Sequence, residues 1–179
     1  GAAIAIGQNA KAQYEGIAFG TGSATESGLA FGAGSSSISG IAIGEDAVAT
    51  FGIAIGQGAL AALPSSLAMG ELANAGANGA TSLGFRSQVI AENATAIGHR
   101  ATAQHQNSVA IGFQTQTDRQ DSVAMGFRQV TGVRAGTSGE DAVNLNQLNE
   151  DGLHIDFNAF NSQGAQADGF ESLAIGNGA

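Results

Sequence analysis

Residues 108–126 read SVAIGFQTQTDRQDSVAMG, and this stretch begins and ends with the same kind of five-residue unit. The unit is small, apolar, alanine, apolar, glycine, and it occurs ten times in succession, with Ser82 replacing the alanine once. Successive unit glycines are 13, 12, 12, 12, 14, 14, 14, 14 and 14 residues apart. The unit glycines are Gly7, Gly20, Gly32, Gly44, Gly56, Gly70, Gly84, Gly98, Gly112 and Gly126. Such a period indicates a repeat architecture in which each unit stacks on the next.

The pattern within each repeat predicts two short strands. Apolar residues one and three positions before the glycine alternate with the alanine, which is the period of a β-strand. Small residues three and five positions after the glycine, such as Ala47 and Ala49, indicate a second strand that faces the first. Two strands and two turns form one coil of a β-solenoid, whose coils stack about 4.8 Å apart.

We expect the large residues of the first strand to meet the small residues of the second strand inside a thin roll. The alanines between the two apolar columns would then point outward. An outer column of apolar residues predicts close contact with another chain, and therefore a homo-oligomer. The residues expected at this seam between chains are Ala42, Ala54, Ala68, Ala96, Ala110 and Ala124.

Two motifs in this order resemble the YadA-like trimeric autotransporter adhesins of Gram-negative bacteria. Residues 108–112 are identical to the head-repeat motif Ser-Val-Ala-Ile-Gly of that family, and residues 141–148, DAVNLNQL, resemble its neck motif Asp-Ala-Val-Asn-Val-x-Gln-Leu. The resemblance implies an all-β fold, a left-handed parallel β-roll with coils of 12–14 residues, forming a homotrimer and followed by a short neck. It also implies a location at the bacterial cell surface, with an outer-membrane anchor outside this sequence.

The resemblance also divides the chain. We expect β-roll head repeats over residues 1–135 and a neck over 136–149. We expect a connector and the start of a second head repeat over 150–179, because residues 172–176 read SLAIG. The chain begins in mid-repeat, which suggests a fragment of a longer surface protein. The expected neck contacts are Asp141, Ala142, Val143, Asn144, Leu145, Gln147 and Leu148.

Charge is unevenly distributed along the chain, whose net charge is -9. This acidic balance argues against nucleic-acid binding. All arginines lie between residues 86 and 134, and Arg86, Arg100 and Arg128 each stand two positions after a unit glycine. Stacked coils would align these three on one edge. That edge is either a binding site for an anionic or matrix ligand, or a solvated turn.

A second column, one position after the glycine, carries rings. It is expected either to fill a corner of the roll or the seam between subunits, or to form an exposed adhesive patch. Its members are Phe85, His99, Phe113 and Phe127.

Nothing in the sequence predicts a catalytic or metal site, a cofactor or an enzyme. There is no cysteine, and the three histidines lack paired ligand spacing. Neighbouring acids such as Glu140 and Asp141 would point to opposite faces of a strand, so they are poor catalytic pairs. No apolar run approaches the ~18 residues of a membrane span, so direct membrane contact by this segment is not expected.

The expected function is multivalent attachment to host extracellular matrix, to cells or to other surfaces. The alternative is a passive structural spacer in a long trimeric fibre. A hexapeptide-repeat enzyme needs coils of about 18 residues, which this spacing does not give. An ice-binding solenoid needs Thr-x-Thr ladders, which occur only at Thr115 and Thr117. The Gly-Gly-x-Gly-x-Asp repeat of calcium-binding solenoids is absent.

Overall fold

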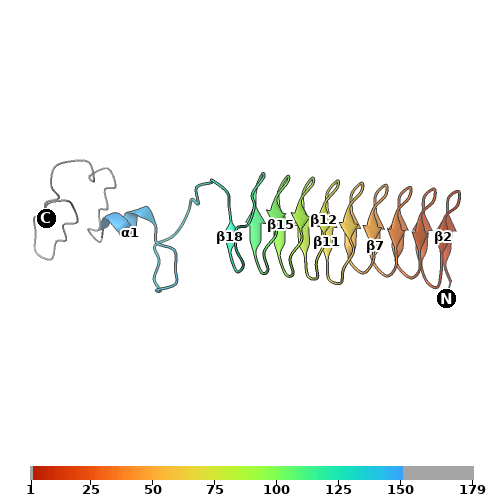
Figure 1. Ribbon diagram of the computed structural model, residues 1–179, viewed down its shortest axis with the longest axis horizontal. Helices are drawn as coiled ribbons and strands as arrows, with labels where there is room; N and C mark the ends of the chain where they lie inside the picture. Colours follow the sequence, from red (N-terminus) through yellow and green to blue (C-terminus); the bar gives the residue numbers. More distant parts are fainter. Residues whose placement is uncertain (1, 151–179) are drawn as a thin grey trace, which may run out of the picture. The chain divides into compact units, whose positions relative to one another are not determined.

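Eight of the glycine-marked repeats each fold into one flat coil of two short strands and two turns, and the last two repeats each add one strand to the stack (Figure 1). The computed structural model describes residues 2–150. The chain divides into two units after Arg128, and the first unit is the roll of stacked coils. The predicted all-β parallel roll is therefore confirmed. Among the residues that the structure describes, no helix has the length and apolar character to cross a bilayer.

The strands form two parallel sheets, in which each strand pairs with its equivalent one coil away, as Ala42 does with Ala54. The large sheet consists of β1 (Ile4–Ile6), β3 (Ile17–Phe19), β5 (Leu29–Phe31), β7 (Ile41–Ile43), β9 (Ile53–Ile55), β11 (Leu67–Met69), β13 (Thr81–Leu83), β15 (Thr95–Ile97), β17 (Val109–Ile111) and β18 (Val123–Ala124). The small sheet consists of β2 (Lys11–Ala12), β4 (Ala24–Thr25), β6 (Ser36–Ser37), β8 (Val48–Ala49), β10 (Leu60–Ala61), β12 (Asn74–Ala75), β14 (Gln88–Val89) and β16 (Thr102–Ala103).

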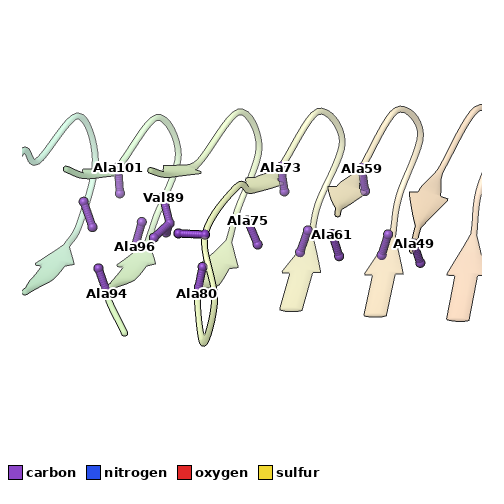
Figure 2. Close-up of a cluster of buried hydrophobic side chains, with 14 of the residues drawn as sticks. Ala49, Ala59, Ala61, Ala73, Ala75, Ala80, Val89, Ala94, Ala96 and Ala101 are labelled. Carbon is purple, nitrogen blue, oxygen red and sulfur yellow. The ribbon is translucent and has the colours of Figure 1, made fainter. Parts of the chain in front are cut away.

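The space between the sheets is filled by small side chains from both of them. Figure 2 shows the methyl groups of Ala61, Ala75 and Ala96, among others, directed into this space. Val89 is the largest fully buried side chain, and buried serines and threonines fill other positions. The small residues of the second strand therefore lie inside, as the repeat predicts.

The prediction for the first strand was wrong, because its faces are reversed. The alanines expected at an outer seam, Ala42, Ala54, Ala68, Ala96 and Ala110, are 0% exposed, and Ala124 on the last strand is partly buried. The large residues on either side of them point outward. The physical reason is the thinness of the coil, because tight turns at both ends hold the sheets too close for Ile or Phe to lie between them.

The unit glycine is required by backbone geometry. Gly44 has a φ of +132°, a region that residues with a Cβ rarely adopt. A Cβ at Gly44 would also lie 2.5 Å from the carbonyl oxygen of Gly56, the equivalent residue in the next coil. Conformation and close approach thus impose glycine in the coils from Gly7 to Gly98, which explains why this residue sets the period.

The change from 12- to 14-residue coils lies in the second turn. In the shorter coils the large-sheet strand is preceded directly by a glycine, as at Gly28, Gly40 and Gly52. In the longer coils this position holds a serine or alanine, such as Ala80 or Ala94. A Cβ at Gly40 would overlap the carbonyl oxygen of Gly52. The longer turn has two extra residues, and there the position before the large-sheet strand has room for a side chain.

We expect Gly40→Ala to lower the free energy of unfolding by about 1–3 kcal/mol, the usual cost of overpacking. Denaturant unfolding followed by circular dichroism measures the change. Gly139→Ala is the matched control, because no atom lies within 4 Å of a Cβ built at Gly139. Equal midpoints for the two variants would contradict this account of the short turn.

β18 is the last strand of the large sheet and no strand of the small sheet follows it among the described residues, and the roll unit ends at Arg128, before the expected limit at residue 135. The second unit contains one described helix, α1 (Leu145–Glu150). The expected connector and second head repeat lie, apart from Glu150, outside the described residues.

Candidate functional site

The outer face of the large sheet is an exposed apolar surface, which we call the apolar face. Its residues lie one and three positions before each unit glycine, and all except Thr81 and Thr95 are apolar. Phe31 is 48% exposed, and its ring stacks on that of Phe19 with 4.8 Å between the centroids. The exposed members include Ile4, Ile6, Ile17, Phe19, Phe31, Ile41, Ile53, Met69, Ile97, Ile111, Val123 and Met125. A continuous apolar surface of this kind marks a site of interaction with another molecule.

Three of the four expected rings stack along the turn that follows the large sheet. The rings of Phe85 and His99 pack edge to face with 5.0 Å between their centroids, and those of His99 and Phe113 do so at 5.2 Å. Phe127 is fully exposed, and no ring among residues 2–150 packs against it. The ring column is therefore a three-membered stack within the roll.

Arg86 and Arg100 lie on the same edge, one residue further along. Both are exposed and adopt left-handed conformations, with φ values of 52° and 56°. The Cζ atom of Arg86 lies 5.1 Å from the centroid of the Phe85 ring, within the range of a cation–π contact. The ion pair found among residues 2–150 joins Arg119 and Asp118 instead. The two guanidinium groups therefore face solvent without a carboxylate partner in that part of the chain.

Arg128 does not extend this pair into a ladder of three. Its guanidinium folds back onto the last coil and donates hydrogen bonds to Thr115 Oγ1 at 2.8 Å, the Met125 carbonyl oxygen at 2.8 Å and the Phe113 carbonyl oxygen at 3.0 Å. The repeat spacing predicts its column correctly but assumes that another coil follows. Because β18 is the last strand of the roll, the Arg128 side chain forms hydrogen bonds at the end of the roll instead of facing solvent.

Asn144 and Gln147, two of the residues expected in a neck, form a capping box at the start of α1. Asn144 Oδ1 accepts a hydrogen bond from the Gln147 amide at 3.0 Å, and Gln147 Oε1 accepts one from the Asn144 amide at 3.4 Å. Gln147 also accepts from the Gly136 amide at 2.7 Å and donates to the Gly136 carbonyl at 2.9 Å. Asn144 Nδ2 donates to the Val133 carbonyl at 3.0 Å. These two amide side chains thus fasten the helix start to residues 133–136.

The apolar residues of the neck are left uncovered in a single chain. Val143 is 64% exposed and Leu145 is 70% exposed. Ala142 and Leu148 are exposed as well. The motif therefore combines two polar residues that fix its backbone with apolar residues that are free to contact another chain.

The remaining polar side chains give no catalytic constellation. Among residues 2–150, no group of three or more His, Asp or Glu side chains is placed to hold a metal ion. His105 Nδ1 lies 3.3 Å from Thr117 Oγ1, in a turn of the roll. His154 lies outside the described residues.

Asp141 holds the turn that precedes the helix. Its carboxylate accepts hydrogen bonds from the Thr137 amide at 2.8 Å and the Ser138 amide at 3.0 Å. The bond from the Thr137 amide, followed by that from Ser138, holds the pKa of Asp141 below its ordinary value of 3.8. The ionised carboxylate is therefore the form that stabilises this turn.

We expect the turn at residues 137–141 to loosen in acid. Because the pKa of Asp141 is lower in the folded neck than in the unfolded chain, its contribution is complete above pH 3.8 and is lost as the pH falls below that value, through the folded-state pKa. An acid titration of the Thr137 and Ser138 amide signals by NMR measures this change. Asp141→Asn keeps an acceptor oxygen but cannot ionise, so its amide signals should show no such transition. An Asp141 carboxyl that titrates at or above 3.8 would contradict the argument.

The chain is similar to known proteins over the same roll. The family model described as the YadA head domain repeat matches residues 64–87, 90–115 and 106–128. The crystal structure of the collagen-binding domain of the Yersinia adhesin YadA is 26% identical, with a TM-score of 0.66, covering 84% of this chain and 97% of that one. No curated protein matches the sequence. The repeat pattern, the sheet topology and these similarities agree: the chain has the parallel β-roll fold of the YadA head, and its residues 64–87 and 90–128 are similar to the YadA head domain repeat.

Proposed function

We propose that this chain is the head of a bacterial surface adhesin, which binds extracellular matrix such as collagen without catalysing a reaction. The observation that carries the proposal is the similarity to the YadA collagen-binding domain over 84% of the chain. The absence of a metal-binding or catalytic cluster among residues 2–150 is compatible with this role but does not carry it. The repeated coil supplies many equivalent positions along one rod, so individually weak contacts would act together.

The active form in this proposal is a homotrimer. Three copies would turn their apolar faces toward a common axis, which removes the exposed Ile and Phe residues from water. The exposed residues Val143 and Leu145 would continue this contact in the neck. Trimerisation follows from the resemblance to trimeric adhesins, and the exposed apolar face supports it because a single chain leaves that surface in water.

In such a trimer, the turn edge with Arg86 and Arg100 stays available to a ligand. Both side chains are exposed, each follows a residue of the stack formed by Phe85, His99 and Phe113 in the sequence, and Arg86 contacts the Phe85 ring. Guanidinium groups and aromatic rings together suit carboxylates and flat apolar groups on a protein ligand. We assign ligand contact to this edge rather than to Arg128, whose guanidinium is already bonded to the roll.

The proposed assembly predicts a particle of about 53 kDa, three times the chain mass of 17.6 kDa. Light scattering on a size-exclusion peak measures this mass. The double variant Ile41→Glu/Ile53→Glu places charges on the apolar face, and we expect it to give a smaller particle because burying a charge is costly. Val48→Glu is the matched control, since Val48 is exposed on the small sheet, and it should keep the wild-type mass. A wild-type mass of 17.6 kDa, or an equal loss of mass in the control, would refute the assembly.

The ligand edge predicts weaker attachment when its charges are removed. We expect Arg86→Ala/Arg100→Ala to bind immobilised collagen several-fold less well than the wild type at low salt, with a smaller difference at high salt, because exposed charges are screened. Surface plasmon resonance on a collagen-coated chip measures this. Arg119→Ala, which removes an exposed arginine from the opposite turn, should bind like the wild type.

Two results would redirect this proposal. Unchanged binding of the double variant at both salt concentrations would remove the edge from the mechanism but leave the adhesive head. A trimeric wild type that binds none of collagen, fibronectin and laminin would favour the alternative of a spacer in a longer fibre.

A further inference from the structure

The coil that begins with β17, which we call the last coil, has carbonyl oxygens that would accept backbone hydrogen bonds if the regular ladder continued. Inside the roll, the residue before each unit glycine accepts a hydrogen bond from the next glycine, as the Ile97 carbonyl does from the Gly112 amide at 2.7 Å. The residue after the glycine also accepts one from the next coil, as the His99 carbonyl does from the Gln114 amide at 2.9 Å. These two bonds join each turn to the next.

The equivalent acceptors in the last coil are the carbonyls of Ile111 and Phe113. By the repeat, their donors would be the backbone amides of Gly126 and Arg128. In the described structure neither amide makes its bond. The side chain of Arg128 lies there instead, with Nη1 3.5 Å from the Ile111 carbonyl oxygen and Nη2 3.0 Å from the Phe113 carbonyl oxygen.

The guanidinium also occupies the space of a following coil. A Cβ built at Gly98 would lie 2.6 Å from the carbonyl oxygen of Gly112, the next unit glycine. A Cβ built at Gly112 would instead lie 2.5 Å from Cζ of Arg128. Where each other turn packs against a peptide group, the last turn thus packs against a planar guanidinium.

We propose that Arg128 is a side-chain cap that closes the C-terminal end of the roll. Its guanidinium takes the place of the two backbone donors, the amides of Gly126 and Arg128, that the repeat would supply. The fork holds its N–H donors on separate nitrogens in one plane, so that Nη1 and Nη2 reach two carbonyls of one turn, whereas an ammonium group has all of its donors on a single nitrogen. Further hydrogen bonds to Thr115 Oγ1 and to the Met125 carbonyl, both at 2.8 Å, hold the fork in position.

The cap has a physical purpose at this location. An open sheet edge exposes unpaired backbone groups, from which strands fray and to which other chains can add. Arg86 and Arg100 occupy the same column, but their own backbone amides bond the preceding turn, at the carbonyls of Glu71 and Phe85, so their side chains are not needed there. The role of Arg128 is therefore set by its place at the end of the stack, and it does not depend on adhesion.

Hydrogen exchange of single amides tests the proposal in the intact protein. Gly112, Gln114 and Thr117 donate the bonds that join the last coil to its predecessor. We expect Arg128→Gln to speed exchange of these three amides by roughly ten- to hundredfold, which corresponds to the loss of charge-assisted hydrogen bonds. Arg100→Gln is the matched control and should change them less than twofold. The amides of Gly44 and Gly56, in the middle of the roll, should stay slow and show that the variant is folded.

The variant Arg128→Lys tests whether the planar geometry of the guanidinium is required in addition to its positive charge. Lysine keeps the positive charge but carries its three donors on a single nitrogen and so lacks the two-nitrogen fork, and we expect exchange nearly as fast as in Arg128→Gln. Wild-type exchange in Arg128→Lys would overturn the proposal, because charge alone would then suffice. Unchanged protection in Arg128→Gln, or an equal change in Arg100→Gln, would overturn it as well.

Discussion

The closeness of the two sheets is the constraint on which the rest of this structure depends. Each coil closes through tight turns, and the carbonyl of one unit glycine lies against the next, as for Gly44 and Gly56. Only methyl and hydroxymethyl groups, with a few threonines and Val89, fit between the sheets. Every larger apolar side chain must therefore point outward, and the roll gains less from its own interior than its apolar content suggests. The backbone ladder between coils consequently carries much of the cohesion along the axis.

This constraint explains which parts of the fold follow from sequence. The glycine period gives the coil length and the alternation gives two strands per coil, because both depend only on local geometry. The residues paired across the ladder follow directly, since each lies one period from its partner. The facing of the first strand does not follow from the alternation, because both of its faces are apolar. Size is the signal that decides it, because Phe19 and Phe31 are too large for the interior that Ala18 and Ala30 fill.

The parts of the candidate site that depend on the local repeat are also predicted from the sequence, whereas the parts that depend on where the roll ends are not. The columns of rings and arginines are predicted because equivalent positions align in a stack. The hydrogen bonds of the Arg128 side chain to the roll are not predicted, because the repeat describes a side chain correctly only where the coils continue regularly. In the neck, the sequence motif identifies the residues, but the bonds between Gln147 and Gly136 depend on a fold-back of the chain that periodicity does not describe.

The two outer faces of the roll differ, and this difference decides how copies can associate. The outward column of the small sheet is mostly small or polar, with Ser36, Asn74, Gln88 and Thr102 among its members. The outward columns of the large sheet are apolar along nearly the whole roll. Because each chain has one apolar face, a closed assembly that buries this face is favoured over an open filament. In such an assembly, the small sheet and the turn edge with Arg86 and Arg100 would remain on the outer surface. The small interior therefore accounts for the exposed apolar face, because the side chains that it excludes form the surface through which the proposed trimer would assemble.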